Sequence, residues 1–131
     1  MSGIRIVVAV LSLLLVVGSA RAKEWLILKP ASAPQAYTIA TEEFQKFYQA
    51  VTGKELAIVT EADESSNLVV IGSDSVNRFC RKAVEQKIIP PLGVGADTDT
   101  YCLRSAEKDD RKFLFLAGGN GRSTLYAVYD F

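Results

Sequence analysis

The sequence predicts an α/β domain, a sandwich in which helices pack on a mixed sheet of about five strands. Three short runs are apolar on both faces of a strand: WLIL from Trp25, LVVI from Leu68 and FLFL from Phe113. Such runs are typical of strands that protein covers on two sides. Other segments repeat apolar residues at steps of three and four, which is the helical period. The predicted order is β-α-β-β-α-β-β-α.

The first strand and the first helix occupy residues 24–53. Residues 24–29 read EWLILK, and because both strand faces are apolar we expect this strand inside the sheet, ending at Pro30. From Tyr37 to Val51 apolar residues recur at helical spacing, and Gly53 ends the helix. Aromatic residues in such a stripe could line a sugar subsite. The spacing is more typical of a helix face buried in the core.

A short second strand is expected at residues 56–59, followed by a polar turn at residues 61–67. Three carboxylates gather in this turn: Glu61, Asp63 and Glu64. Glycoside hydrolysis requires a pair of carboxyl groups, so the turn is a candidate catalytic site. Catalytic pairs lie in pockets that perturb their pKa values, whereas these acids flank serines in a turn. We therefore interpret them as solvated.

The buried run at residues 68–71 predicts the third strand, which Gly72 ends. Ser73, Asp74 and Ser75 are alternative N-caps for a second helix that fades before Ile88. Residues 89–98 carry two Pro and two Gly. This composition predicts an irregular loop and the best candidate for a mobile segment.

The last strands and helix follow residue 99. Residues 100–105 and 113–116 read as an antiparallel hairpin with a charged turn at residues 106–110. A Gly-rich loop at residues 117–121 then leads into a helix that includes Leu125 and Val128. No Gly or Asn cap, basic last turn or Pro stop precedes Phe131. The sequence therefore predicts a last helix that is incomplete.

The Gly-rich loop has two interpretations. A strand, a Gly-rich loop and a helix N-terminus can cradle an anion, which makes Asn120 and Arg122 weak ligand-contact candidates. Neither GxxxxGK[ST] nor GxGxxG fits, because the second pattern would need Gly at Thr124. The structural interpretation is that the glycines adopt positive φ in a tight turn while Ser123 or Asn120 caps the helix. The sequence favours the structural interpretation.

Composition excludes several kinds of partner and site. Fifteen basic residues balance fifteen acidic ones, so the basic face expected of a nucleic-acid binder is not indicated. The sequence contains no His, which removes the commonest general base and metal ligand, and we expect no metal and no cofactor. Cys80 and Cys102 either form one disulfide, as an exported protein permits, or are two small buried apolar side chains.

Residues 1–22 have the pattern of a secretory signal peptide. Arg5 precedes an apolar run at residues 6–17, and Ala20-Arg21-Ala22 matches a small-x-small cleavage site. The competing interpretation is an uncleaved anchor, but the run is shorter than the roughly 20 residues that span a bilayer. We expect cleavage after Ala22, a secreted or periplasmic protein, and no membrane attachment after cleavage.

The mature chain, residues 23–131, resembles the N-terminal accessory domain of alpha-glucuronidases and beta-hexosaminidases. The segments that carry the resemblance are EWLILK, FQKFYQAVTGKEL, LVVIGSD, DTYCLRS and FLFLAGGNGRSTLYAVYDF. The most specific is GRSTLYAVYDF from Gly121, although Ser123 stands where many relatives carry Gly. In these families the catalytic acid and base lie in the barrel that follows. The resemblance implies no catalytic residue in this chain and a catalytic barrel as its partner.

Three functional hypotheses follow. The first is a non-catalytic accessory domain of a secreted carbohydrate-active protein, which packs against and positions a catalytic barrel. The second is a stand-alone exported module that binds a glycan through Trp25, Tyr37 or the loop at residues 89–98. The third, a small enzyme in its own right, is the weakest because the sequence offers no His, no nucleophile paired with a base and no metal cluster.

Overall fold

The computed structural model describes residues 23–93 and 99–131, and within them it has the predicted order of strands and helices. The predicted signal peptide, residues 1–22, lies outside the described residues, as does the second half of the predicted loop at residues 89–98. The elements are β1 (Trp25–Leu28), α2 (Gln35–Thr52), β2 (Ile58–Val59), β3 (Asn67–Gly72), α3 (Arg78–Glu85), β4 (Tyr101–Lys108), β5 (Arg111–Gly118) and α4 (Gly121–Asp130). The α/β class is confirmed.

The strands form one mixed sheet in the order β2-β1-β3-β5-β4. β1 pairs in parallel with β2 and β3, and β3 pairs in parallel with β5. Only β4 runs antiparallel to its neighbour, as the hairpin with β5 requires. β1 lies inside the sheet, as its two apolar faces predicted. The carboxyl ends of the four parallel strands therefore share one edge.

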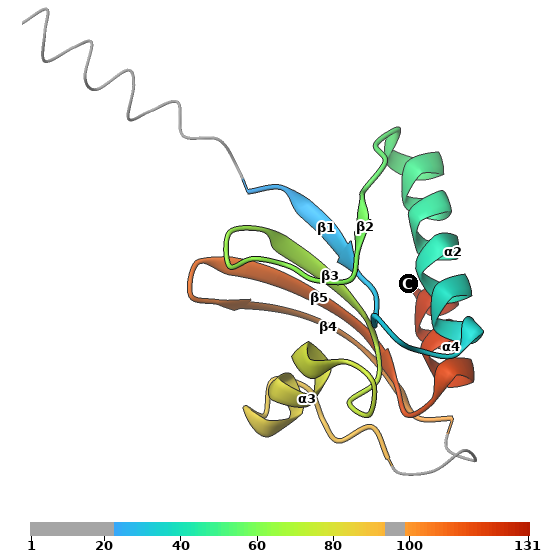
Figure 1. The fold of residues 1–131 in the computed structure, drawn as a ribbon, viewed down its shortest axis with the longest axis vertical. Helices are drawn as coiled ribbons and strands as arrows, with labels where there is room; N and C mark the ends of the chain where they lie inside the picture. The colour runs from blue at the N-terminus through green and yellow to red at the C-terminus, as the bar shows by residue number, and fades with distance from the viewer. Residues whose placement is uncertain (1–22, 94–98) are drawn as a thin grey trace, which may run out of the picture.

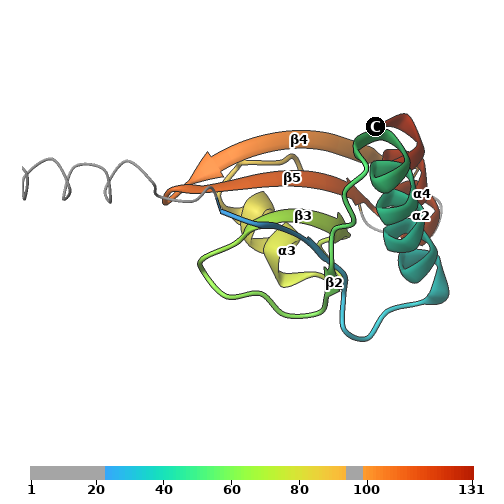
Figure 2. The ribbon, with the colours of Figure 1, turned by 90° about the horizontal axis from the view of Figure 1, so that it is seen from above.

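α2 and α4 lie side by side on one face of the sheet (Figures 1 and 2). Ala40 and Phe44 of α2 and Ala127 of α4 pack there on sheet residues that include Ile27 and Leu116. Each of these side chains is at most 3% exposed. Burying one such Leu, Ile or Phe side chain stabilises the fold by about 1.5–3 kcal/mol.

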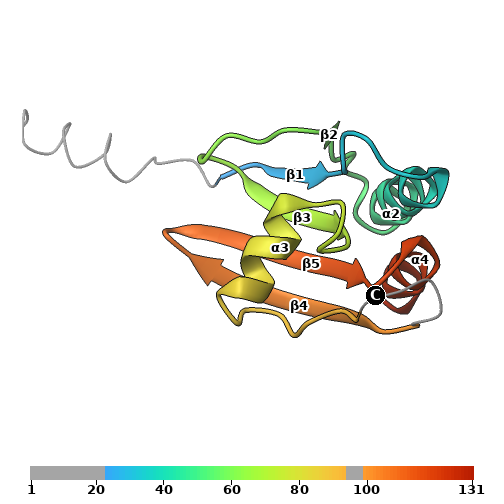
Figure 3. The same ribbon diagram turned by 60° about the horizontal axis from the view of Figure 1, so that its bottom comes forward.

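On the opposite face, the one helix among the described residues is α3, which lies across the sheet in Figure 3. Cys80 and Ala83 of α3 pack there with strand residues Leu68, Val70 and Phe115. The same buried cluster also contains Leu28, Ile89, Leu92 and Ala117. Because α3 has 8 residues whereas α2 has 18, much less of this face is covered by helix. The face left over forms a pocket.

The end of α2 agrees with the prediction, whereas part of its apolar stripe does not. Gly53 adopts a left-handed conformation with φ 74° and donates its N–H to the Gln49 carbonyl, which confirms the predicted stop. The prediction that the whole apolar stripe is core is wrong at its end: Phe47 is 46% exposed and Val51 is 86% exposed. Ala40 and Phe44 belong to the buried cluster on the sheet, whereas Phe47 and Val51 lie outside it.

Two local predictions also need correction. The hairpin turn is tighter than expected, because β4 continues to Lys108 and only Asp109 and Asp110 lie in the turn, with φ 52° and 62°. Two such residues are typical of a type I′ turn, and Asp tolerates the left-handed region. The N-cap of α3 is Asn77 and not residue 73, 74 or 75, because the Asn77 side chain reaches the amides of Phe79 and Cys80.

Among the described residues, no helix has the length and apolar character needed to cross a bilayer.

Candidate functional site

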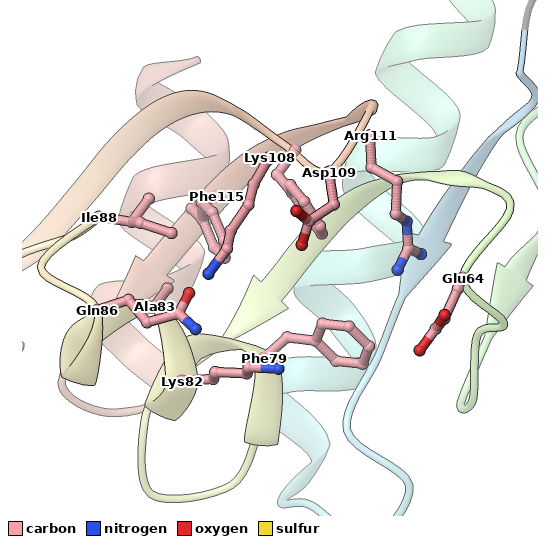
Figure 4. Close-up of a pocket in the computed structure, with 11 residues that line it drawn as sticks. Glu64, Phe79, Lys82, Ala83, Gln86, Ile88, Lys108, Asp109, Arg111 and Phe115 are labelled. Atoms are coloured by element: carbon pink, nitrogen blue, oxygen red, sulfur yellow. The ribbon is translucent and has the colours of Figure 1, made fainter.

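A pocket of about 210 Å³ lies between α3 and the β4–β5 hairpin, and we call it the α3 pocket (Figure 4). Its apolar wall comes from α3 and β5, through Phe79, Ala83, Phe113 and Phe115, with Ile88 just beyond α3. Its polar lining consists of Glu64, Lys82, Gln86, Lys108, Asp109 and Arg111. The pocket exists because α3 is too short to cover the end of the hairpin.

Arg111 stands at the mouth of the α3 pocket but is committed to the fold. It is 8% exposed, and its guanidinium donates to the carbonyls of Ser66 at 2.8 Å and Asp63 at 2.7 Å. Its guanidinium carbon also lies 5.3 Å from the centroid of the Phe113 ring. Arg111 therefore joins the hairpin to the turn before β3. In the sequence, Arg111 lies in a run of mixed charge just after the predicted turn, and residue spacing does not indicate its burial.

The acidic turn is organised by Asp63. Its carboxylate accepts hydrogen bonds from the Ser65 hydroxyl at 2.7 Å and the Ser65 amide at 2.9 Å. The bond from the Ser65 hydroxyl is the main cause of a pKa lowered below the ordinary aspartate value, with the Ser65 amide second. Glu61 and Glu64 are exposed, so the turn lacks the desolvated carboxyl that glycoside hydrolysis needs. This agrees with the solvated interpretation.

The aromatic side chains of the α3 pocket offer little open ring surface to a sugar. Phe113 stacks on Phe115 with ring centroids 5.7 Å apart and planes at 15°, and Arg111 lies over the Phe113 ring. Lys108, Asp109 and Gln86 also line the α3 pocket (Figure 4). The charges of the rim mix both signs. Among the described residues, no group of three His, Cys, Asp or Glu side chains could hold a metal ion.

The predicted glycan contacts Trp25 and Tyr37 are both placed against the core. Trp25 is partly buried and packs on the cluster beneath α2 and α4. Tyr37 is 3% exposed, and its hydroxyl hydrogen-bonds to the Ser73 hydroxyl at 3.2 Å. The Tyr37 ring therefore presents no surface to a glycan, which corrects that part of the binding-module hypothesis. Neither residue lines the α3 pocket.

The predicted contacts Asn120 and Arg122 belong to the start of α4. The Asn120 side chain accepts from the Ser123 amide at 2.8 Å, and the Ser123 hydroxyl accepts from the Asn120 amide at 3.0 Å, which forms a capping box. Arg122 pairs with Asp99 at 2.7 Å on the surface. The predicted cap is confirmed, and Asn120 is occupied by it.

The glycines of this loop serve close packing and not positive φ. Among the described residues, positive φ at glycine occurs at Gly53, Gly72 and Gly93, so the expected left-handed turn in this loop is wrong. A Cβ at Gly118 would overlap the backbone nitrogen of Thr124, and one at Gly121 would lie 2.7 Å from the Ala36 Cβ. The loop lets β5, α4 and the start of α2 approach each other.

Cys80 and Cys102 are free thiols in this structure. Both belong to the cluster under α3, where Cys80 is buried and Cys102 partly buried. Burial raises the pKa of the Cys80 thiol far above its ordinary value, and burial also raises that of Cys102. The neutral thiols act as core side chains here, and the predicted disulfide stays a prediction.

α2, α4 and the adjacent start of β4 carry a group of exposed large side chains, which we call the aromatic face: Phe47, Val51, Tyr101, Tyr126, Tyr129 and Phe131. The Phe47 and Tyr129 ring centroids lie 6.5 Å apart, and the Tyr101 and Tyr126 centroids also lie 6.5 Å apart. Phe131 contacts Phe44 of α2, with centroids 5.6 Å apart. Exposed groups of this kind mark interaction surfaces. Sequence reasoning missed this face because helical spacing alone predicted core.

Comparison with known proteins agrees with this architecture. The model of one protein family, the glycosyl hydrolase family 67 N-terminus, matches residues 18–131. No curated protein matches the chain. Because the family model covers most of the 131 residues, including every described strand and helix, the chain belongs to the glycosyl hydrolase family 67 N-terminus family.

Proposed function

We propose that this chain is a non-catalytic accessory domain of a secreted glycoside hydrolase of family 67 type, and that it packs through the aromatic face on the catalytic domain and positions it. The family match supports an accessory role beside a catalytic domain. The aromatic face is the observation that carries the proposal, because it is a group of large apolar side chains that the domain itself leaves exposed.

Three side chains show why this face suits a protein partner. Phe47, Tyr129 and Phe131 are 46%, 56% and 63% exposed, yet their rings already hold one another or Phe44 in place. Ordered aromatic rings lose little conformational entropy when a partner covers them, and Tyr and Phe are enriched at interfaces. Phe131 lies within the face, at the carboxyl end of α4. In a longer family 67 protein, the chain beyond this domain would start at this surface.

The non-catalytic part of the proposal has its own support. The carboxylates that line the α3 pocket, Glu64 and Asp109, are both exposed to solvent. A general acid for glycoside cleavage needs a raised pKa, which a desolvated site supplies. Cys80 is buried and Cys102 is partly buried, and burial raises the pKa of both thiols, which is the opposite of an activated nucleophile. We expect the purified protein to leave aryl glucuronides and aryl glycosides intact. Turnover that a Glu64→Gln change abolishes would contradict this.

The docking surface can be tested by hydrogen exchange of the protein with and without a family 67 catalytic domain supplied as a separate chain. With the catalytic domain present, we expect slower amide exchange in the second half of α2 and in α4, and no change in the exchange of α3. A Phe47→Ser/Tyr129→Ser double variant should lose most of this protection. Ile39→Ser is the matched control, because Ile39 is on the same helix and 40% exposed but outside the aromatic face. Protection of α3 in place of α4 would contradict the proposed surface.

The competing function is a stand-alone glycan-binding module, for which the α3 pocket is the available cavity. Calorimetric titration with neutral and acidic oligosaccharides separates the two functions. A binding module should saturate and should lose affinity when Gln86 is replaced by Ala, whereas an accessory domain should give no heat of binding. Export belongs to the proposal and is tested by sequencing the N-terminus of the exported protein, which we expect to begin at Lys23.

A further inference from the structure

A second pocket lies at the carboxyl edge of the parallel strands, on the far side of the α3 N-terminus from the α3 pocket. It has a volume of about 320 Å³, and we call it the switch-point pocket. Its lining comes from the carboxyl ends of β1 and β2, the loop between β3 and α3, and the start of α3: Leu28, Lys29, Pro30, Ala31, Thr60, Glu61, Val76, Asn77, Arg78, Phe79 and Arg81. The proposed function makes no use of these residues.

The sheet topology gives this edge a particular significance. After β1 the chain passes through α2 on one face and returns to β2, on one side of β1. After β3 it passes through α3 on the other face and continues to β4, on the opposite side. The loops after β1 and β3 therefore diverge, and crevices at such points are where open α/β sheets bind ligands.

Three cations line this pocket: Lys29, Arg78 and Arg81. Within residues 23–93 and 99–131 the ion pairs are Lys23–Asp110 and Arg122–Asp99, so none of the three cations is paired with a carboxylate. Glu61 is the one carboxylate in the lining. The pocket thus carries an excess of positive charge in a protein whose formal net charge is zero.

The two arginines contact backbone carbonyls and an aromatic ring, and these contacts do not neutralise their charge. Arg81 Nε donates to the Asp74 carbonyl at 3.1 Å, and its guanidinium also reaches the Ser75 carbonyl at 3.5 Å. The Arg78 guanidinium lies 5.1 Å from the centroid of the Phe79 ring. These contacts fix the positions of both groups and leave N–H donors for an anion. Bidentate guanidinium geometry suits carboxylate and phosphate.

Two amides of the α3 N-terminus, those of Phe79 and Cys80, already donate to the Asn77 side chain. The shape of the pocket depends on Gly72. A Cβ there would lie 3.2 Å from both Pro30 Cγ and Asn77 Cβ, so the glycine lets the loops after β1 and β3 meet. Pro30 and Val76 give the pocket an apolar side next to its cations.

We propose that the switch-point pocket binds a small organic oxyanion, a carboxylate or a phosphate ester, whose charge is held by Lys29, Arg78 and Arg81 and whose carbon skeleton lies against Pro30 and Val76. This site is on the α3 side of the sheet and is independent of docking through the aromatic face. The failure of either proposal therefore leaves the other intact.

The test is to titrate the purified protein separately with gluconate, glucitol and inorganic phosphate and to monitor each titration through the NMR chemical shifts of the backbone amides. Gluconate and glucitol share a carbon skeleton and differ in the carboxylate. We expect gluconate at about 10 mM to shift the amides of Lys29, Thr60 and Arg78, and glucitol to leave them unchanged. A response to phosphate alone would assign the site to phosphate groups. The response should weaken as salt is raised.

Variants make the outcome specific to the pocket. Arg78→Gln/Arg81→Gln should weaken anion binding about tenfold or more, because each change removes a charge-assisted hydrogen bond. Arg104→Gln, an exposed position on β4, is the control and should bind as the unmodified protein does. Equal shifts with glucitol, an equal loss in Arg104→Gln, or no shift with either anion would overturn the proposal.

Discussion

α2 and α4 place 18 and 10 residues of helix on one face of the sheet, whereas α3 places 8 on the other. The first face is covered so fully that apolar side chains continue past the core to the outer surface of the helices. The second face is incompletely covered, and both pockets border α3. One sheet therefore supplies two different surfaces. A surplus of aromatic side chains suits a protein partner, and incomplete cover leaves room for small molecules.

The largest expected difference between the two faces of the sheet is the loss of stability when one buried ring is removed from each face. Phe44→Ala removes a ring that is 3% exposed and touches Tyr48 and Phe131, and we expect a loss of about 3–5 kcal/mol. Phe79→Ala removes a partly buried ring beside the pockets and should cost only about 1–2 kcal/mol. Urea denaturation measures both. Equal losses would mean that the two faces are equally well packed.

The joint between β5 and α4 is the next test of the fully covered face. Gly118→Ala should destabilise the fold by about 1–3 kcal/mol, because the new Cβ meets backbone atoms of Ser123 and Thr124 that cannot move aside. Gly53→Ala is the reference, since its Cβ would meet no atom within 4 Å and only the left-handed φ of 74° is strained. In thermal unfolding, the Tm of Gly118→Ala should be lower than the Tm of Gly53→Ala. The reverse order would show that the joint is loose.

The N-caps of α3 and α4 allow a further comparison of the two faces, with smaller expected losses of stability. Asn77→Ala and Asn120→Ala each remove an N-cap, at a cost of about 1 kcal/mol. Because α3 is short and packs alone, we expect loss of its cap to speed exchange of α3 amides only. Loss of the α4 cap should lower protection in α2 as well, since α2 and α4 pack together. Hydrogen exchange distinguishes these outcomes, and Asn77→Asp is the control that keeps a capping side chain.

The smallest expected effect concerns pH at the edge of the aromatic face. The Tyr101 hydroxyl donates to the Asp130 carboxylate at 3.3 Å, and repulsion of a phenolate by Asp130 is the main cause of a raised Tyr101 pKa. A raised folded-state pKa means that the contribution is complete below the unfolded value of about 10 and is lost as pH rises through the folded-state value. We expect Tyr101→Phe to narrow the Tm difference between pH 8 and pH 11 slightly. An unchanged difference would mean that the contact is too exposed to matter.

Local chemistry made much of the fold predictable. The doubly apolar runs at β1, β3 and β5 identified the inner strands, because such runs need cover on both faces. Gly53 and Asn120 were recognisable as a helix stop and a helix cap from residue type and position alone. These features depend on neighbours within a few residues, which a sequence displays directly.

The surfaces were not predictable in the same way. Whether Phe47 is core or exposed depends on which side of α2 packs on the sheet, and the burial of Arg111 depends on carbonyls at Asp63 and Ser66. The switch-point pocket assembles Lys29 and Arg81 from segments that only strand order brings together. Information of this kind belongs to the topology, and residue spacing does not contain it.

The close approach at Gly118 and Gly121 gives α4 a fixed heading. Its first turn is held by backbone against backbone at β5 and by the Ala36 methyl group of α2, and Thr124 Oγ1 donates to the Gly72 carbonyl of β3. Any polypeptide that leaves the carboxyl end of α4 therefore inherits a direction set by the strands. Under the proposed function, this fixed direction is what would orient the catalytic domain relative to the sheet.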